Sequence, residues 1–543
     1  MLNKHTVVYQ IYPKSYKDSN NDGIGDLRGV IEKLDYIKEL GANFIWLTPF
    51  FVSPQNDNGY DIADYYNIDP LYGSMADVEE LIAEARKRDI DIMFDMVFNH
   101  TSTKHEWFQK ALTGDPKYVD YYIFKDNPTN WESKFGGNAW EYVPSLGKYY
   151  LHLFDRTQAD LNWDNPEVRE ELKKIVRFWI EKGIKGFRFD VINLISKPAI
   201  FEDDSTGDGR KFYTDGPQIH EFLKELSLDT GLDEDGIVTV GEMSSTTIDN
   251  CIRYSNPDEK ELSMCFNFHH LKVDYKNQQK WELQDCDFEA LKKLLVTWQV
   301  EMEKGNGWNA VFWCNHDQPR IVSRFGNDGK YHKESAKMLA TMVHFLRGTP
   351  YVYQGEEIGM TNAYFDKLAQ YKDVESLNYY LILKQAGKSD EEIFQILQAR
   401  SRDNSRTPMQ WEDSEHAGFS AVEPWIPVIH NYADINVANS LQDEDSIFHY
   451  YKKLISLRRE MDIIAHGSFR PVLQEQQEIF AYQRTYLNEE LLVMTNFFEQ
   501  PVEVTMCDVE VDGYQYLLSN YDERPLEQTI ILRPYEAVVF YKK

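Results

Sequence analysis

Short runs of apolar residues recur along the first two thirds of the chain, and polar residues follow most of them. Eight of these runs are spaced like the strands of one sheet: Val7–Tyr12, Asn43–Pro49, Asp91–Met96, Gly186–Val191, Val238–Met243, Ser263–Phe268, Asn309–Cys314 and Tyr351–Glu356. Most are almost continuously apolar, which is typical of strands buried on both faces of a parallel sheet. Strands that alternate with helices predict such a sheet, and eight repeats favour its closure into a (β/α)8 TIM barrel.

Apolar residues between these runs recur at intervals of three and four, which indicates amphipathic helices. The strongest such pattern begins at Asn165-Pro166 and ends at Gly183, with the start and stop residues that helices favour. Two shorter patterns cover 30–41 and 78–85, and Asp77 is the predicted cap of the second.

The intervals between strands also predict how the chain divides into domains. The interval after the third strand is about twice the usual one and is rich in aromatic residues, Asn and Gly. A second insertion, helical over 391–400, is predicted at 361–425, and short alternating strands follow at 478–486, 491–498 and 529–541. We therefore predict three domains: a barrel (1–100 and 166–467), a small inserted domain after strand 3 (101–165) and a C-terminal antiparallel β-sandwich domain (468–543).

The composition excludes several classes of partner. A formal charge of −31 leaves no basic stripe for nucleic acid, although a few local cations would suffice for a small phosphorylated substrate. No run of about 18 apolar residues occurs, so we expect no membrane span. The five cysteines form no CxxC pair, and the N-terminus runs directly into the first predicted strand, which leaves no room for a signal peptide. We expect a cytoplasmic protein with reduced thiols; oligomeric state has no signal in the sequence.

Polar residues recur where four of the predicted strands end. These segments are Asp-Met-Val-Phe-Asn-His (95–100), Gly-Phe-Arg-Phe-Asp-Val (186–191), Val-Gly-Glu-Met (240–243) and Cys-Asn-His-Asp (314–317). The carboxyl ends of barrel strands meet at one face, where barrel enzymes carry their active sites. Cleavage of a glycosidic bond needs one carboxyl group to protonate the leaving oxygen and another to meet the developing positive charge. The spacing thus predicts such a pair at this face.

Asp190 and Glu242 are the predicted central pair. Arg188, on the same strand as Asp190, would hold that carboxylate ionised and aimed, which favours a nucleophile. Glu242 ends a more apolar strand, where desolvation would raise its pKa as an acid requires. Asp317 supplies a third carboxylate, able to orient sugar hydroxyls. Asp95, deeper in its strand, is interpreted as a structural partner of Arg188; for each of these acids the alternative is a strand-end salt bridge.

These segments resemble the four sequence regions of the α-amylase superfamily, glycoside hydrolase family 13. The stretch Gln158–Asn162 looks like the form typical of oligo-1,6-glucosidases, with Ala where proline is common, and the resemblance covers the whole chain. It implies a retaining α-glycosidase in which Asp190 is the nucleophile, Glu242 the acid/base and Asp317 the transition-state stabiliser. It also implies a group of residues that line the subsite for the non-reducing glucose: Asp57, Tyr60, His100, Arg188, His316 and Arg402, the last with Arg406 close by as a competitor.

The loop after the first predicted strand carries oxygen ligands at every second position: Asp18, Asn20, Asp22, Ile24 and Asp26. This is EF-hand spacing, with glycines that let the loop curl. Position 12 is Gly29 instead of a bidentate Glu, and no long helix precedes the loop, so it is not an EF-hand. In the oligo-1,6-glucosidases that the chain resembles, this loop holds a Ca²⁺. We expect a structural Ca²⁺, with an Asx-rich turn as the alternative.

Two features bear on the substrate. Val191, directly after Asp190, resembles the group that acts on α-1,6 or similar linkages. Segments 192–220 and 266–274 look like trehalose-6-phosphate hydrolases, which split that disaccharide phosphate into glucose and glucose 6-phosphate. Cations for a phosphate are available on the nearby loops: Lys197, Arg210, Lys211, His270 and Lys272.

We therefore predict a small-molecule substrate, either trehalose 6-phosphate or another α-glucoside. The alternative enzyme is an oligo-1,6-glucosidase or dextran glucosidase acting on isomaltose-type ends, which would share the catalytic residues and have no need of the cations. A non-catalytic barrel, like the ectodomains of amino-acid transporter heavy chains, is disfavoured because the chain keeps all three acids and has no transmembrane helix.

Overall fold

Eight parallel strands form the barrel of this chain, of which the computed structural model describes residues 2–543. The strands are β1 (Val8–Ile11), β2 (Phe44–Leu47), β5 (Asp91–Met96), β11 (Gly186–Phe189), β12 (Val238–Glu242), β13 (Met264–Phe266), β14 (Ala310–Val311) and β15 (Thr349–Tyr353). They are ordered β13-β12-β11-β5-β2-β1-β15-β14, and a parallel bridge between Cys265 and Asn309 joins the two ends. The predicted barrel is confirmed, and each predicted run contains or overlaps one of its strands.

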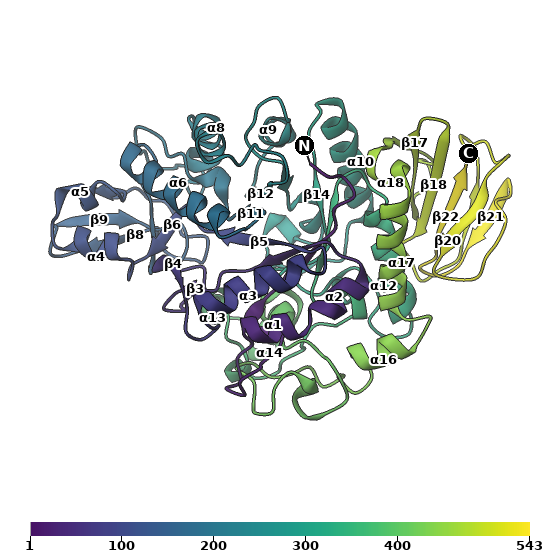
Figure 1. The fold of residues 1–543 in the computed structure, drawn as a ribbon, viewed down its shortest axis with the longest axis horizontal. Helices are drawn as coiled ribbons and strands as arrows, with labels where there is room; N and C mark the ends of the chain where they lie inside the picture. Colours follow the sequence, from purple (N-terminus) through teal and green to yellow (C-terminus); the bar gives the residue numbers. More distant parts are fainter. Residues whose placement is uncertain (1) are drawn as a thin grey trace.

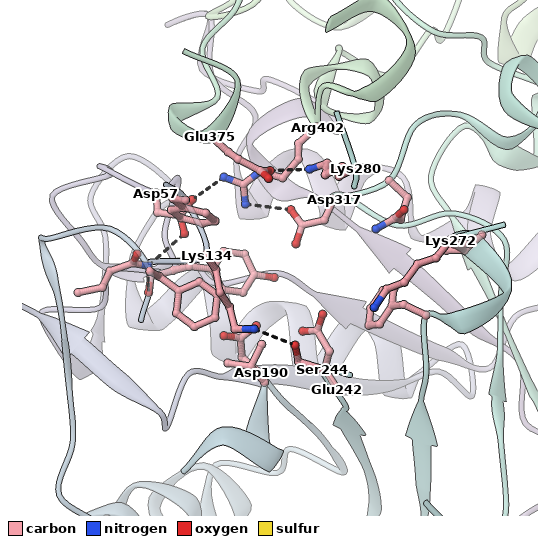
Figure 2. A pocket seen from close by; sticks show the side chains of 18 of the residues that line it. Asp57, Lys134, Asp190, Glu242, Ser244, Lys272, Lys280, Asp317, Glu375 and Arg402 are labelled. Atoms are coloured by element: carbon pink, nitrogen blue, oxygen red, sulfur yellow. Dashed lines mark hydrogen bonds and ion pairs between the residues drawn. The ribbon is translucent and has the colours of Figure 1, made fainter. Parts of the chain in front are cut away.

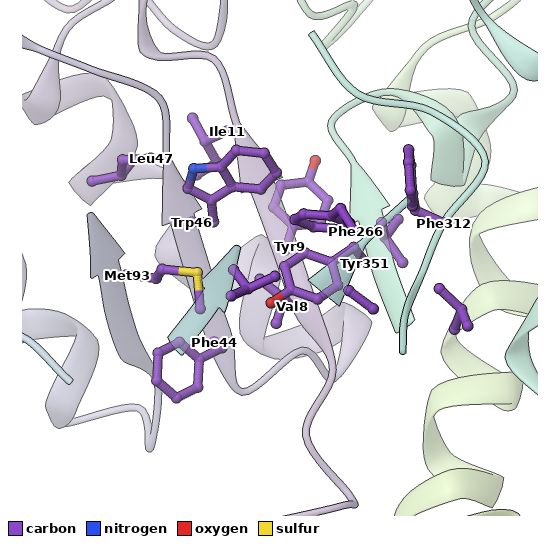
Figure 3. Close-up of a cluster of buried hydrophobic side chains, with 14 of the residues drawn as sticks. Val8, Tyr9, Ile11, Phe44, Trp46, Leu47, Met93, Phe266, Phe312 and Tyr351 are labelled. Carbon is purple, nitrogen blue, oxygen red and sulfur yellow. The ribbon is translucent and has the colours of Figure 1, made fainter. Parts of the chain in front are cut away.

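Large side chains pack together inside the barrel (Figure 3). The Trp46 ring lies 5.7 Å from that of Phe266 and 6.2 Å from that of Tyr351, measured between centroids. The indole N–H of Trp46 donates to Asp95 Oδ2 at 3.1 Å. The apolar interior is therefore a packed core, as in other barrels. One of its residues, Trp46, also holds the carboxylate of Asp95 in place.

Helices surround the barrel (Figure 1). The predicted helix at 165–183 is α6 (Pro166–Glu181), and Asn165 caps it by accepting from the N–H of Glu167. The pattern over 30–41 is two helices, α1 (Leu27–Glu32) and α2 (Leu34–Leu40), separated at Lys33. The N-terminal cap of α3 (Met75–Arg86) is Ser74 and not the predicted Asp77. The Asp77 carboxylate accepts from the backbone N–H of Ser74 at 2.8 Å.

The two insertions meet beyond the carboxyl ends of the barrel strands. In the first, β6 (His100–Ser102) pairs with β10 (Gln158–Asp160), and a second sheet is ordered β7 (Phe124–Lys125), β9 (Lys148–Leu151), β8 (Trp140–Val143). The second contains α13 (Val374–Gln385) and α14 (Asp390–Arg400). The Asn378 side chain of α13 donates to the carbonyl of Phe135 at 3.4 Å. This contact joins the two insertions.

The C-terminal region consists of two antiparallel sheets. The larger is ordered β16 (Ser468–Pro471), β17 (Ile479–Tyr486), β18 (Glu489–Asn496), β22 (Ala537–Lys542), β20 (Gln515–Ser519), and the smaller pairs β19 (Val502–Thr505) with β21 (Thr529–Leu532). Alternate residues of β17 face different clusters: Phe480 and Tyr482 pack with the barrel, whereas Ile479 and Ala481 pack between the sheets. The segment 529–541, predicted as one strand, is two, because Tyr535 adopts a positive φ of 51° after Pro534.

The cysteines and the helices bear on two chain-wide predictions. All five cysteines are free thiols. Within residues 2–543, none of the helices combines the length and the apolar character that a membrane span requires.

Candidate active site

A cavity of about 250 Å³ opens where the barrel strands end beneath the two insertions (Figure 2). Seven of the predicted site residues line it: Asp57, Tyr60, His100, Asp190, Glu242, Asp317 and Arg402. Arg188 and His316 do not line it, in contrast to the expectation from the resemblance. They are almost fully buried and contact the residues that do. The fold therefore brings the nine predicted catalytic and sugar-binding residues together. Seven form the cavity wall, and Arg188 and His316 lie behind that wall.

Arg188 binds three carboxyl groups at the base of the cavity. Its Nη1 donates to Asp95 Oδ1 and to Asp190 Oδ1, each at 2.7 Å, and its Nη2 donates to Glu242 Oε2. The three acids come from neighbouring strands, β5, β11 and β12, whose register brings their ends together. Asp190 and Glu242 thus converge on one guanidinium, as predicted, and the predicted Asp95–Arg188 pair is confirmed.

Glu242 has the electrostatic surroundings of an acid catalyst. Burial raises the pKa of its carboxyl group, Arg188 opposes this, and the carboxylates of Asp190 and Asp317 raise the pKa further. The net result is a pKa well above the ordinary value for glutamate. The raised pKa favours the protonated carboxyl group, the form that can donate a proton to a leaving oxygen. The predicted direction is confirmed, although neighbouring carboxylates contribute as well as the apolar strand end.

Asp317 is in the opposite state. Burial alone would raise the pKa of its carboxyl group, but His316, Arg402 and Arg406 together hold that pKa well below the usual value. Its Oδ1 accepts from Arg406 Nη2 at 2.7 Å and from Arg402 Nη1 at 3.3 Å. Asp317 is consequently a fixed negative charge across the cavity from Glu242 (Figure 2).

The two arginines that the sequence left in competition have different positions. Arg402 lines the cavity and donates to Asp57 Oδ1 at 3.1 Å and to Asp373 Oδ1 at 2.6 Å. Arg406 is fully buried behind it and donates to the carbonyl of His316 at 3.0 Å. Arg402 is therefore the arginine that a bound sugar would meet.

The two predicted histidines also differ. The Gln10 amide nitrogen, which can only donate, lies 2.8 Å from His316 Nδ1, so the ring hydrogen is on Nε2. That Nε2 is buried without a hydrogen-bond partner, although Asp317 Oδ2 is 3.3 Å away. Because His316 is fully buried and does not line the cavity, this nitrogen is not exposed to a bound sugar. His100 has no free ring nitrogen, because Nδ1 contacts the Asn99 amide and Nε2 the carbonyl of Tyr60.

Val191, the residue directly after Asp190, has a strained backbone. Its φ of 36° and ψ of 40° lie in the left-handed region, which β-branched residues rarely adopt. Such a conformation costs about 1–3 kcal/mol and persists only where the surroundings enforce it. The backbone N–H of Asp190 is held by the carbonyl of Met96 at 3.0 Å, so the turn that aims the carboxylate is fixed on both sides.

Several residues of the cavity wall carried no recognisable sequence signal. They come mainly from the insertions and from the loop after β13: Lys134, Phe135, Phe154, Phe268, Tyr275, Lys280 and Glu375. Lys134 donates to Ser244 Oγ at 3.2 Å and, among residues 2–543, to no carboxylate. Lys280 is paired with Glu375 at 2.5 Å. A charged residue in an irregular loop has no periodicity to place it, so only the tertiary contacts identify it.

Of the five cations considered for phosphate, only Lys272 lines the cavity. The others have partners of their own: Lys197 with Asp160 at 2.9 Å, Arg210 with Asp208 at 2.8 Å, Lys211 with Asp204 at 2.6 Å and His270 with the carbonyl of Phe312 at 2.9 Å. Lys272 forms no ion pair within residues 2–543, and its pKa is lowered by partial burial and by Arg210. It is the one predicted cation that remains available at the cavity.

The loop 18–26, predicted to hold Ca²⁺, curls around its own carboxylates. Asp18 Oδ2 accepts from the N–H of Gly23 at 2.8 Å and from the hydroxyl of Ser420 at 2.6 Å. Asp22 accepts from the N–H two residues later, and Asp26 caps α1. These are the hydrogen bonds of an Asx-rich turn, and they also fix the curl that oxygen ligands at every second position require. The donor set suits a hard cation, and the Asp22 side chain is exposed.

The chain is similar over almost its whole length to known sugar-cleaving proteins. The family model described as alpha amylase, catalytic domain, matches residues 10–467, and the alpha-amylase SusG C-terminal domain matches 479–539. The trehalose-6-phosphate hydrolase of Bacillus subtilis (strain 168) is 54% identical over 99% of this chain and 97% of its own. The oligo-1,6-glucosidase of Bacillus cereus is 48% identical over 99% of each chain. A crystal structure of Bacillus licheniformis trehalose-6-phosphate hydrolase matches with a TM-score of 0.95 and 57% identity, over 99% of both chains.

Removal of either central carboxyl group should greatly lower turnover. The cause differs between the two variants, because Asp190 is the nucleophile and Glu242 is the acid. We expect Asp190→Asn and Glu242→Gln each to lower kcat about 10³-fold or more, because double displacement needs both groups. Added azide distinguishes the two roles when the substrate is p-nitrophenyl α-glucoside, whose leaving group needs no proton. With azide, Glu242→Gln should recover activity and form an α-glucosyl azide. Asp190→Asn should instead form the β-glucosyl azide.

Asp91→Asn is the matched control, because Asp91 is exposed at the opposite end of β5. It should retain near-normal turnover. Near-normal kcat in either active-site variant, or the same azide anomer from both, would contradict the assigned roles.

Proposed function

This chain belongs to the α-amylase family of glycoside hydrolases, and from that premise we propose that it hydrolyses trehalose 6-phosphate to glucose and glucose 6-phosphate. The supporting relatives carry that activity in their names at 54% and 57% identity. The observation in this structure that carries the proposal is a pair of cations, Lys134 and Lys272, beside Asp190 and Glu242.

These two lysines suit a dianionic group. Neither forms an ion pair with a carboxylate within residues 2–543, whereas Lys280 beside them is neutralised by Glu375. Burial lowers the pKa of Lys134 to about 8, and repulsion from Arg210 and Lys272 contributes. A phosphate between them would relieve that repulsion and accept charge-assisted hydrogen bonds. A neutral disaccharide would leave the repulsion between the two lysines unrelieved.

One cation of the cavity, Lys272, lies away from the predicted glucose subsite. Asp57 and Arg402 lie on one side of the catalytic carboxylates, and Lys272 lies on the opposite side (Figure 2). In this arrangement the non-reducing glucose contacts Asp57 and Arg402, which both line the cavity. The leaving glucose 6-phosphate then extends toward the lysines.

We assign the reaction as a double displacement with retention. Asp190 and Glu242 contact two nitrogens of the same guanidinium, which supports the shorter of the two carboxyl separations known for glycosidases, the one found in retaining enzymes. Asp190 attacks the anomeric carbon and forms a bond to it while the bond from that carbon to the bridging oxygen breaks, and Glu242 gives its proton to the departing oxygen. A water oxygen then attacks the same carbon, Glu242 takes a proton from the water, and the bond to Asp190 breaks, which releases glucose and restores both carboxyl groups. Asp317 opposes the positive charge that develops on the sugar ring.

Oligo-1,6-glucosidase activity is the second candidate, since a relative of that name is 48% identical and Val191 follows the nucleophile. It needs the same three acids and no phosphate site. A substrate panel therefore distinguishes the two candidates.

Loss of charge at the lysines should affect only the phosphorylated substrate. We expect Lys272→Met and Lys134→Met each to raise KM for trehalose 6-phosphate about ten- to a hundredfold, because a hydrogen bond to a charged group contributes about 1.5–3 kcal/mol. KM for isomaltose and p-nitrophenyl α-glucoside should change less than about twofold. The measurement is initial rate with glucose 6-phosphate or glucose as the readout.

Lys276→Met, an exposed lysine on the same loop as Lys272, is the control and should change neither KM. Equal losses on charged and neutral substrates would remove the lysines from phosphate recognition. Wild-type turnover of isomaltose equal to that of trehalose 6-phosphate would instead overturn the proposed function.

The pH dependence should also differ between substrates. Lys134 carries its charge below a pKa of about 8 and loses it as the pH rises through that value. Phosphate stays dianionic over the same range, because its second pKa is about 6. The ratio of kcat/KM for trehalose 6-phosphate to that for p-nitrophenyl α-glucoside should therefore fall between pH 7 and 9 in the wild type. In Lys134→Met the ratio should be flat, and a wild-type ratio that stays constant would contradict this assignment.

We also propose that Ca²⁺ binds the loop 18–26 in a structural role, with oxygens from Asp18, Asn20, Asp22, Ile24 and Asp26. Ca²⁺ should raise Tm and EDTA should lower it, because an ion that binds only the folded state stabilises it. Asp22→Ala should lose this response, and Asp413→Ala, an exposed acid elsewhere, should keep it. A wild-type Tm that is the same in Ca²⁺ and EDTA would exclude the ion.

We propose a cytoplasmic location as well, because five unpaired thiols suit a reducing compartment.

A further inference from the structure

Two histidines and an aspartate gather near the start of the barrel, far from the catalytic carboxylates along the strands. His5 precedes β1, and Asp462 and His466 lie four residues apart on α18 (Asp462–His466), the helix that leads into β16. One ligand atom from each lies within 4.8 Å of the others. No other group of three His, Cys, Asp or Glu side chains in residues 2–543 meets this spacing.

The orientation of the His5 ring is the decisive observation. Its Nδ1 lies 2.8 Å from the backbone carbonyl of Arg458. A carbonyl oxygen only accepts, so Nδ1 carries the hydrogen and donates it. In the neutral ring, Nε2 then has a free lone pair, which faces Asp462 Oδ1 at 3.1 Å. Two acceptors do not approach this closely without a positive charge between or on them. That charge is either a second proton on the ring or a bound metal ion.

The hydrogen bond of His5 is of the kind that metal-binding histidines make. Ligating histidines commonly donate their other ring N–H to a backbone carbonyl, which fixes the tautomer and the ring orientation. Zinc at about 2.0–2.1 Å from each ligand places neighbouring tetrahedral ligand atoms about 3.3 Å apart, close to the His5–Asp462 distance. Residues four apart on a helix lie on one face, so α18 presents Asp462 and His466 together. The His466 ring is 5.4 Å from the His5 ring, edge to face.

We propose that His5, Asp462 and His466 bind one divalent transition-metal ion, with Zn²⁺ as the reference ion and water completing its coordination. Two imidazoles and one carboxylate suit Zn²⁺, Co²⁺, Ni²⁺ or Cu²⁺, and do not suit Ca²⁺ or Mg²⁺, which take oxygen ligands. The ion links the segment that enters β1 to the helix that enters the C-terminal sheet. Its role is therefore structural, at the end of the barrel that contributes to stability and not to catalysis.

The test uses the full chain without an affinity tag, stripped of metal and held in excess Ca²⁺ so that the loop 18–26 does not compete. Co²⁺ is titrated and followed by its visible absorption, Zn²⁺ is titrated by calorimetry, and Tm is measured with and without Zn²⁺. The variants are His466→Gln and Asp462→Asn, which leave His5 and its contact with Arg458 intact. His430→Gln, an exposed histidine outside the cluster, is the control.

We expect one Zn²⁺ per chain and a rise in Tm in the wild type and in the control. In His466→Gln and Asp462→Asn the dissociation constant should increase at least about tenfold and the rise in Tm should disappear, with kcat unchanged. Absence of Zn²⁺ binding, or binding with the same affinity in both variants, would overturn the proposal.

Discussion

Arg188 lies at the bottom of the cavity with carboxyl groups from three neighbouring strands around it. Asp95, Asp190 and Glu242 could not approach one another in a buried site without a cation, and a buried guanidinium without carboxylates would be equally unstable. The indole ring of Trp46 packs 5.0 Å from the guanidinium and closes the site from the core side. The interaction joins the barrel interior to the chemistry, because the strand register that forms the core also sets the carboxyl positions.

The same arrangement gives neighbouring carboxyl groups different proton affinities. Glu242 is buried among like charges, so its pKa is raised, whereas Asp317 faces Arg402 and Arg406 and its pKa is lowered. A protonated acid and a fixed carboxylate can thus coexist in one cavity at the same pH. Such separation is the general way in which one site supplies both an acid and an anion. Here the two pKa values differ because the strand ends and the second insertion place different basic groups beside each acid.

Part of the cavity wall comes from segments outside the barrel. Lys134 and Phe135 come from the first insertion, and Glu375 comes from the second. The hydrogen bond between Asn378 and Phe135 holds these segments against each other above the strand ends. A change in either insertion can therefore alter which group fits beside the leaving sugar without disturbing Arg188 and its carboxylates. The barrel strands supply the carboxyl groups, and the loops and insertions supply much of the surrounding wall.

The sequence by itself determined the eight strands, the acids at their carboxyl ends and the convergence of Asp190 with Glu242, because buried parallel strands leave continuous apolar runs and polar residues follow them directly. It could not separate Arg402 from Arg406, since both follow the same short stretch and only their depth differs. It also missed Lys134, and among five candidate cations it could not single out Lys272. Loops have no periodicity, and whether a cation is already paired depends on partners distant in the chain. The cluster of His5 with Asp462 and His466 likewise exists only because folding brings residues more than 450 positions apart into contact.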